Sequence, residues 1–176
     1  MAVTTLTLRS MTGDDVGDVL ALEQEIFTHP WTEGILRSEL AAPGRAYLVA
    51  TEDDRVVGYG GVMVVADEAH ITNLAVAPGH RGRGIATRLV LDLAEGALDG
   101  DAEHLTLEVR MSNLDARRLY RRFGFAPGGR RKHDYGDEDA LSMTVVDAAG
   151  PEYGRGLADI REGLRCASPR RSAASR

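Results

Sequence analysis

The chain has 176 residues, of which 43% are hydrophobic and 27% are charged, so it can form the core of one domain. Its formal net charge of −6 argues against a general nucleic-acid-binding protein, and no apolar run approaches the roughly 18 residues of a membrane span. The single Cys166 excludes an internal disulfide, and no signal-peptide pattern is present. We therefore expect a cytoplasmic protein with no DNA or membrane partner.

The first part of the chain predicts one strand and two helices. Apolar and polar residues alternate near residues 4–9, which is typical of a strand. Either Asp14 or Asp15 is expected to cap a helix that runs to about Phe27. Thr32 then begins a second helix, which a Pro-Gly pair ends.

The middle of the chain predicts an antiparallel meander followed by a helix and a strand. Residues 46–52, 55–65 and 70–77 form three strand-like runs with short turns between them. Residues 84–98 carry apolar side chains at helical spacing. Residues 104–110 again alternate, so we expect another strand there.

The next segments complete the predicted fold. Residues 113–124 predict a helix that ends at Gly124, and residues 125–132 and 140–146 predict a final pair of strands. The order of elements is β α α β β β α β α β β. It indicates an α/β (α+β) fold, with a mixed, mostly antiparallel twisted sheet of about six or seven strands flanked by about four helices.

We predict one domain over residues 4–146, then a linker and an Arg-rich, flexible tail over residues 147–176, with a short helix near residues 156–166. From Pro151 onward six arginines face three acidic residues, so this tail carries +3 and the rest carries −9. A solvated end is favoured over contact with an acidic partner or ribosomal RNA. The five histidines are scattered without the spacing of metal ligands, so we expect no metal.

One glycine-rich segment, "HRGRGIATR" at residues 80–88, lies between a strand and a helix. Backbone N–H groups at a helix start lack internal partners, and glycines let a phosphate approach the main chain. The residues alone leave two interpretations open, a diphosphate site and a solvated basic turn. The Walker and dinucleotide-binding patterns are both absent.

Two motifs carry a resemblance to a known family. The segment "RGRGIA" at residues 81–86 resembles the Arg/Gln-x-x-Gly-x-Gly/Ala motif of the GNAT superfamily of N-acetyltransferases, and "NLDARRLYRRFGF" at residues 113–125 resembles a later motif of that superfamily. Within it the chain looks most like the ribosomal-protein alanine N-acetyltransferases, because it also contains "HPWTEG", "LEVRMSN" and "EDALSM". The resemblance covers roughly residues 5–146 and implies the GNAT fold.

The resemblance implies acetyl-CoA as the acetyl donor. The main chain of residues 74–76 would pair with the pantetheine arm, residues 82–87 would hold the diphosphate with Arg81 beside it, and Asn113 would meet the pantetheine. The implied cofactor-binding residues are Leu74, Ala75, Val76, Arg81, Gly82, Arg83, Gly84, Ile85, Ala86, Thr87 and Asn113.

The resemblance also implies Glu108 as general base and Tyr120 as general acid. Along residues 105–110, alternation puts Glu108 on the opposite face from the leucines, where a carboxylate could accept a proton from an amine. The structural alternative for Glu108 is an outward side chain paired with Arg110 or a neighbour. The structural alternative for Tyr120 is a tyrosine of the core. Because a phenol is a weaker acid than a thiol, a hydrogen bond from Tyr120 to the leaving sulfur describes its role equally well.

For the acceptor side we predict Trp31, Glu33 and Tyr135. Trp31 would be a wall of the pocket or an anchor of the helix pair, and Glu33 would attract an amine or act only as a first-turn acid. Relatives often carry two adjacent tyrosines where this chain has His133 and Asp134.

The resemblance implies transfer of acetyl to the N-terminal α-amine of a protein, typically an alanine on a small-subunit ribosomal protein. A lysine side chain or a small amine remains an alternative acceptor. A non-catalytic acyl-CoA sensor is the alternative of another class.

Overall fold

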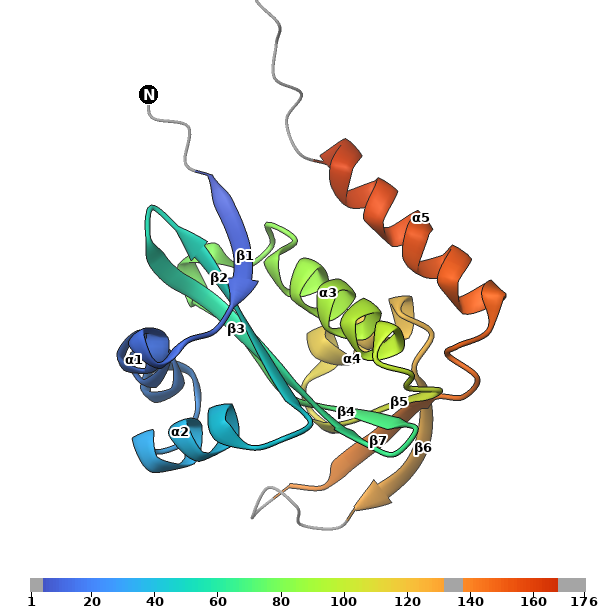
Figure 1. Ribbon diagram of the computed structural model, residues 1–176, viewed down its shortest axis with the longest axis horizontal. Helices are drawn as coiled ribbons and strands as arrows, with labels where there is room; N and C mark the ends of the chain where they lie inside the picture. Colours follow the sequence, from blue (N-terminus) through green and yellow to red (C-terminus); the bar gives the residue numbers. More distant parts are fainter. Residues whose placement is uncertain (1–4, 132–137, 168–176) are drawn as a thin grey trace, which may run out of the picture.

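The computed structural model describes residues 5–131 and 138–167. The strands and helices follow the order β α α β β β α β α β β that the sequence predicts, and helix α5 (Pro151–Ala167) follows the last strand (Figure 1). The strands are β1 (Leu6–Ser10), β2 (Arg45–Glu52), β3 (Arg55–Val65), β4 (Glu68–Val76), β5 (His104–Arg110), β6 (Ala126–Arg131) and β7 (Ala140–Val145). The helices are α1 (Val16–Ile26), α2 (Glu33–Ala41), α3 (Ile85–Asp99), α4 (Leu114–Arg122) and α5 (Pro151–Ala167).

The seven strands form one sheet in the order β1-β2-β3-β4-β5-β7-β6. Neighbours are antiparallel except β4 and β5, which run parallel because α3 connects them across the sheet. Helices α1 and α2 lie on one face, whereas α3, α4 and α5 lie on the other (Figure 1). The predicted fold class is therefore confirmed, and so is the β2–β4 meander.

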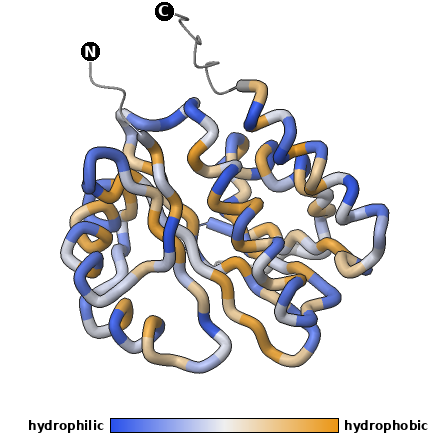
Figure 2. The backbone as a smooth tube through the Cα atoms, turned by 45° about the horizontal axis from the view of Figure 1, so that its top comes forward, coloured by the Kyte–Doolittle hydropathy of each residue, from blue (hydrophilic) through white to orange (hydrophobic). Residues whose placement is uncertain are grey.

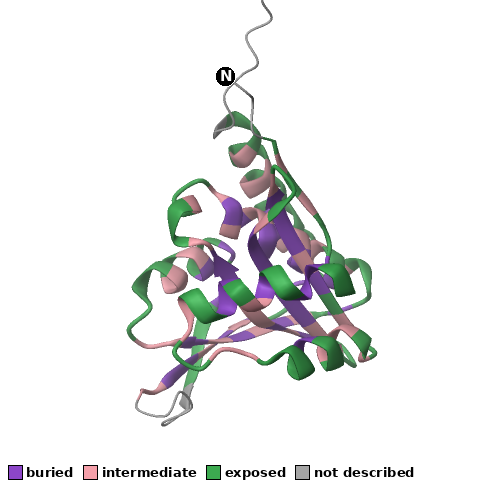
Figure 3. Ribbon diagram, turned by 90° about the vertical axis from the view of Figure 1, so that its left-hand side faces the viewer, coloured by how far each residue is buried: buried purple, intermediate pink, exposed green. Residues whose placement is uncertain are grey.

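Apolar side chains fill both sides of this sheet. The largest cluster joins β5 and β7 to α3, α4 and α5, and a second cluster lies between the sheet and α1 and α2. The buried residues follow the central strands, and hydrophobic stretches run along the same segments (Figures 2 and 3). Leu105, Leu107 and Val109 of β5 are buried whereas Glu108 is only half-buried, as the alternation predicts.

The sheet splits between β4 and β5. Their parallel pairing runs from Glu68 opposite His104 to Ile71 opposite Leu107 and then stops. At this point β4 carries one extra residue, Thr72, because the adjacent Gly61 and Val62 of β3 pair with Asn73 and Ile71. Such a β-bulge bends its strand. We infer that the bulge turns β4 away from β5 and opens a gap.

The start of α2 and the end of α4 lie where the sequence predicts them, whereas the start of α1 differs in its capping. The Thr32 hydroxyl accepts the N–H of Ile35 at the start of α2. Gly124 follows α4 with φ +80°, and the N–H of Phe125 bonds to the carbonyl of Tyr120, which is the expected glycine-ended helix. Asp15 is the N-cap residue of α1, as predicted, but its side chain makes no capping bond to α1. It instead closes the preceding 3-10 turn by accepting the N–H of Thr12.

The C-terminal segment also differs from the sequence-based prediction. The sequence predicts a linker from residue 147 and a short helix near residues 156–166, whereas Pro151–Ala167 form one longer helix, α5. Its three glycines lower helix propensity and suggested a linker. The helix forms because Leu157, Ile160 and Leu164 share one face and pack against the large core. Residues 168–176 lie outside the described residues.

Candidate active site

A cleft of about 600 Å³ opens where β4 leaves β5. It lies between the end of β4, the loop that leads into α3, the start and one side of α4, and the end of α1. Its lining residues are Ile26, Phe27, Leu74, Ala75, Val76, His80, Arg81, Gly82, Gly84, Ile85, Ala86, Thr87, Asn113, Asp115, Ala116, Leu119 and Arg122. Every predicted cofactor-binding residue except Arg83 is among them.

The loop between β4 and α3 presents main-chain donors to this cleft. Gly82 and Gly84 have φ values of +75° and +76°, which favour glycine. The first helical bond of α3 comes from the N–H of Arg88 to the carbonyl of Gly84, so the preceding N–H groups of the turn have no helical acceptor. Together with the helix dipole they form a site for an anion such as a diphosphate.

The two arginines of the loop have different surroundings. The Arg81 guanidinium lines the cleft and donates from Nε to the carbonyl of Val76 at 3.2 Å. Arg83 instead forms a bidentate ion pair with Glu52 at the end of β2, and His80 Nε2 lies 3.1 Å from the same carboxylate. The Arg83 guanidinium lowers the pKa of Glu52. Arg83 therefore ties the loop to β2.

Asn113 lies at the mouth of the cleft as the N-cap of α4. Its Oδ1 accepts the N–H of Ala116 at 3.1 Å, which explains why this residue type begins the helix. The side chain is exposed and borders the cleft beside Ala116 and Leu119.

Glu108 is the first residue of β5 beyond the last parallel pair with β4. It pairs with Ser142 of β7 and is half-buried, on the sheet face opposite α3 and α4. Tyr120 is buried in α4, at 6% exposure, with its ring edge-to-face against Phe125 at 5.8 Å. Neither residue lines the 600 Å³ cleft itself.

The residues predicted for the acceptor have structural partners. The Trp31 ring is half-buried and meets the Tyr47 ring edge-on at 6.4 Å, which fits an anchor of the helix pair. Glu33 is exposed and pairs with Arg37 at 2.8 Å, one turn along α2. Tyr135 lies outside the described residues.

A buried polar network that the sequence analysis did not identify lies under β4. Glu23 of α1 is 1% exposed and accepts the N–H of Trp31 at 2.8 Å and the hydroxyl of Tyr59. The Asn73 amide donates to the Tyr59 oxygen at 2.9 Å, and burial, followed by the Glu23 contact, raises the pKa of Tyr59. The signal was present in the sequence, since Glu23 follows Val16 by seven residues on the apolar stripe of α1.

This network connects the segment after α1 to the bulged strand. Tyr47 forms a second chain beside it, because its hydroxyl donates to Glu39 at 2.8 Å and lies 3.3 Å from the hydroxyl of Thr72. Two short polar chains thus join the helices on this face to the point where the sheet splits.

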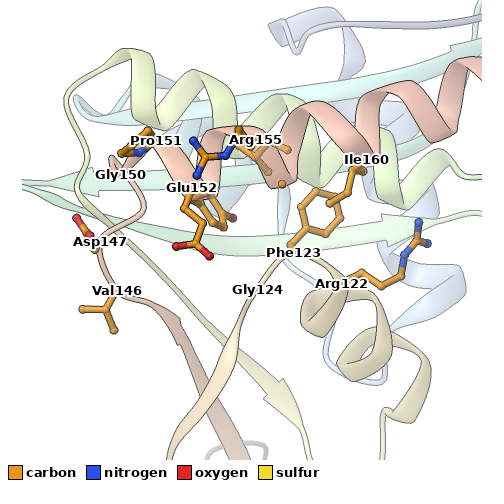
Figure 4. Close-up of a pocket in the computed structure, with 13 residues that line it drawn as sticks. Arg122, Phe123, Gly124, Val146, Asp147, Gly150, Pro151, Glu152, Arg155 and Ile160 are labelled. Carbon is orange, nitrogen blue, oxygen red and sulfur yellow. The ribbon is translucent and has the colours of Figure 1, made fainter.

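Two other features of the described residues lie apart from the cleft. A second cavity, of about 560 Å³, lies between the turn after α4 and the start of α5, and only Arg122 lines both (Figure 4). Asp67, Glu103 and His104 come close enough to share a metal ion, but His104 Nδ1 already accepts the N–H of Asp147. Within the described ranges, no helix is long and apolar enough to cross a membrane.

The fold and the cleft agree with the family that the sequence matches. The sequence model of the Acetyltransferase (GNAT) family matches residues 16–125, a range that includes the glycine loop, β5 and α4. This chain belongs to that family and is an acyltransferase. The family resemblance predicted from the two motifs is thereby confirmed.

Two relatives and one solved structure that are similar to this chain are named as alanine N-acetyltransferases. A Bacillus subtilis (strain 168) protein, named as a candidate ribosomal protein bS18-alanine N-acetyltransferase, is 41% identical over 146 residues, covering 81% of this chain and 97% of that protein. The ribosomal protein bS18-alanine N-acetyltransferase of Salmonella typhimurium is 32% identical over 145 residues, covering 79% and 96%. The crystal structure of the Escherichia coli ribosomal-protein-S18-alanine N-acetyltransferase superposes with a TM-score of 0.76 at 27% identity, covering 84% and 97%.

Proposed function

We propose that this enzyme transfers the acetyl group of acetyl-CoA to the N-terminal alanine of a small-subunit ribosomal protein. The observation that carries the proposal is the cleft at the β4–β5 split, lined by the glycine loop and by the exposed end of β4. Two relatives named for alanine on bS18 support the acceptor. The open space around Gly82 supports the fit of a diphosphate, because no atom beyond its chain neighbours lies within 4 Å of a Cβ built there.

In this proposal the edge of β4 binds the pantetheine arm. Leu74, Ala75 and Val76 pair with β3 on one side, and beyond Ile71 no pairing with β5 occupies the other side. Main-chain groups on this open edge can bond to the amides of the ligand, as another strand would. The Val76 carbonyl also accepts Arg81 Nε. The α3 turn would then hold the diphosphate, with Arg81 beside it and Asn113 near the pantetheine.

Glu108 is the proposed base. Its position directly after the last β4–β5 pair puts it at the apex of the gap, where an acceptor amine could meet the thioester. An N-terminal α-amine has a pKa of about 7.7–8.0, against about 10.4 for lysine, so one carboxylate is sufficient for an α-amine near neutral pH. Tyr120 is the proposed donor to the departing thiolate, by proton transfer or by a hydrogen bond.

An assay of thiol release from acetyl-CoA tests the proposal with three acceptors. These are a peptide that begins with alanine, the same peptide with a blocked N-terminus and an internal lysine, and a polyamine. We expect turnover on the first alone. The Glu108→Gln variant is expected to lower kcat about 100-fold or more, as for loss of a general base, whereas Glu103→Gln, at the exposed residue just before β5, leaves it unchanged.

Other outcomes would contradict particular parts of this proposal. Faster turnover on lysine or the polyamine would exclude the N-terminal acceptor. Tight CoA binding with no turnover on any amine would indicate a sensor. Unchanged turnover in Glu108→Gln would exclude that residue as the base.

A further inference from the structure

Helix α5 lies outside the part of the chain that defines the family. The family match ends at residue 125, and the Bacillus subtilis relative is 97% covered by 81% of this chain. The sheet is complete at β7, so α5 is not needed to build it. The helix nevertheless lies beside α3 (Figure 1), and the contacts between them suggest a role.

Apolar contacts and an ion pair attach α5 to α3. Leu157 is 3% exposed, and Ile160 and Leu164 pack against the same core. Arg161 lies between these residues in the sequence and bonds to Glu95 and, at 3.4 Å, to Asp92, two carboxylates on α3. The helix is therefore held along α3 by both kinds of contact.

The two ends of α5 reach the two elements that flank the cleft. Near its C-terminal end, Leu164 Cδ2 lies 3.3 Å from the position of a Cβ on Gly84. Gly84 is the N-cap of α3 and lines the cleft. Near its N-terminal end, Tyr153 Cε2 lies 3.3 Å from the position of a Cβ on Gly124, in the turn that ends α4.

We propose that α5 braces the cofactor cleft and that Leu164 is a positioning residue for acetyl-CoA, acting through Gly84. This inference rests on the proposed function. A methyl group of Leu164 packs over the Gly84 main chain, and the left-handed backbone of Gly84 sets the direction of the N–H groups at the start of α3. Without that contact, glycine is free to leave this conformation, and a smaller fraction of molecules can bind.

The test compares substitutions in the full chain, with an alanine-starting peptide as acceptor and acetyl-CoA varied. Leu164→Ala is expected to raise the KM for acetyl-CoA and the Kd for CoA about fivefold, as when the competent fraction falls to a fifth. The kcat and the KM for the peptide are expected to stay within about twofold, because the proposed effect of Leu164 passes through Gly84 of the donor-binding loop. Leu164→Met, which refills the space, is expected to restore the wild-type KM.

Leu157→Ala is the matched control. This leucine lies two turns earlier on the same face of α5 and is more deeply buried, so its loss lowers the melting temperature without changing the KM for acetyl-CoA. Leu164→Val, a smaller change, guards against misfolding of the alanine variant and is expected to shift KM in the same direction. An unchanged KM and Kd in the Leu164 variants, or an equal rise in Leu157→Ala, would overturn the inference. Wild-type protein that does not bind CoA would instead overturn the proposed function.

Discussion

Gly84 stands at a position where both backbone and packing favour glycine. Its φ is +76°, and a Cβ would meet Leu164 at 3.3 Å. The sequence motif identifies this glycine as part of an anion site, whereas only the structure identifies the leucine above it. The same residue therefore joins the start of α3 to α5.

Gly84→Ala is expected to raise the Kd for CoA about tenfold, because a left-handed L-residue costs about 1–2 kcal/mol and the loop moves to relieve it. Isothermal calorimetry measures the effect. Gly79→Ala is the control, since Gly79 is in the preceding turn and no atom lies within 4 Å of its added Cβ. Equal affinities in the two variants would exclude Gly84 from the diphosphate site.

The carboxylate of Asp15, which the sequence predicts as a cap of α1, is instead bonded to Arg9 of β1. This carboxylate forms a bidentate pair with Arg9 at 2.7 Å and accepts the N–H of Thr12, and the Arg9 contact chiefly lowers its pKa from 3.8 to about 2. A group whose pKa is lower in the folded state stabilises the fold above its unfolded pKa of about 3.9. That stabilisation is lost as the pH falls from about 4 to about 2.

Asp15→Asn is therefore expected to lower the free energy of unfolding by about 1–2 kcal/mol between pH 5 and 8, since Arg9 is partly exposed to solvent. The difference from the wild type is expected to shrink toward pH 2. Urea unfolding at several pH values measures it, with Asp14→Asn as the exposed neighbour for comparison. A difference that does not depend on pH would refute the charge argument.

At the scale of elements, α1 and the segment after it are attached to the sheet by a buried carboxylate. Glu23 holds the main chain of Trp31 and the hydroxyl of Tyr59, and Asn73 beside Tyr59 precedes the cleft-lining end of β4. Ile26 and Phe27, which line the cleft, lie in the chain between Glu23 and Trp31. We infer that this carboxylate sets the position of the whole segment, which carries Ile26 and Phe27 into the cleft and also carries Trp31, a residue predicted for the acceptor side.

Glu23→Ala is expected to lower the free energy of unfolding by about 2–4 kcal/mol, because it leaves buried donors unsatisfied and creates a cavity. It is also expected to raise the KM for the peptide more than the KM for acetyl-CoA. Urea unfolding and steady-state kinetics measure the two effects. Glu25→Ala, exposed on the same helix, is the control, and equal stability of the two variants would contradict the role of Glu23.

Elements differ in how far their sequences predict them. The strand β5 is predicted to the residue, because Leu105, Leu107 and Val109 alternate with polar residues and a half-buried strand imposes that period. Helix α5 is not, because Gly154, Gly156 and Gly163 weaken the local signal and its stability comes from packing on α3. The local pattern predicts an element when its own periodicity shows which side chains are buried. It does not do so when packing against a distant element stabilises the segment.

At the scale of the whole molecule, the split sheet links ligand binding to the free energy of unfolding, because a ligand in the cleft would stabilise the folded state. The β4 edge beyond Ile71 and the start of α3 carry main-chain groups that the ligand would satisfy. A ligand at 100 times its Kd stabilises the folded state by about 2.7 kcal/mol. For a chain of this size, each kcal/mol raises the Tm by about 2–4 °C.

We therefore expect acetyl-CoA at that concentration to raise the Tm by about 5–10 °C without any acceptor peptide. Differential scanning fluorimetry measures the shift, with adenosine as a control that lacks the diphosphate and pantetheine. Gly84→Ala at the same acetyl-CoA concentration is expected to give a smaller shift. The absence of a shift in the wild type would argue against the cleft as the donor site.

The sequence by itself determined the order of strands and helices, the fold class, the family, and the loop that lines the cleft, since periodicity and glycine motifs are local properties of the chain. It also supplied Glu108 and Tyr120 through the family resemblance. Only the tertiary structure decided that Arg83 pairs with Glu52, that Glu23 is buried beneath β4, and that α5 reaches Gly84. Each of these contacts joins residues at least 31 positions apart, and their partners depend on how the sheet splits and how the helices pack across it.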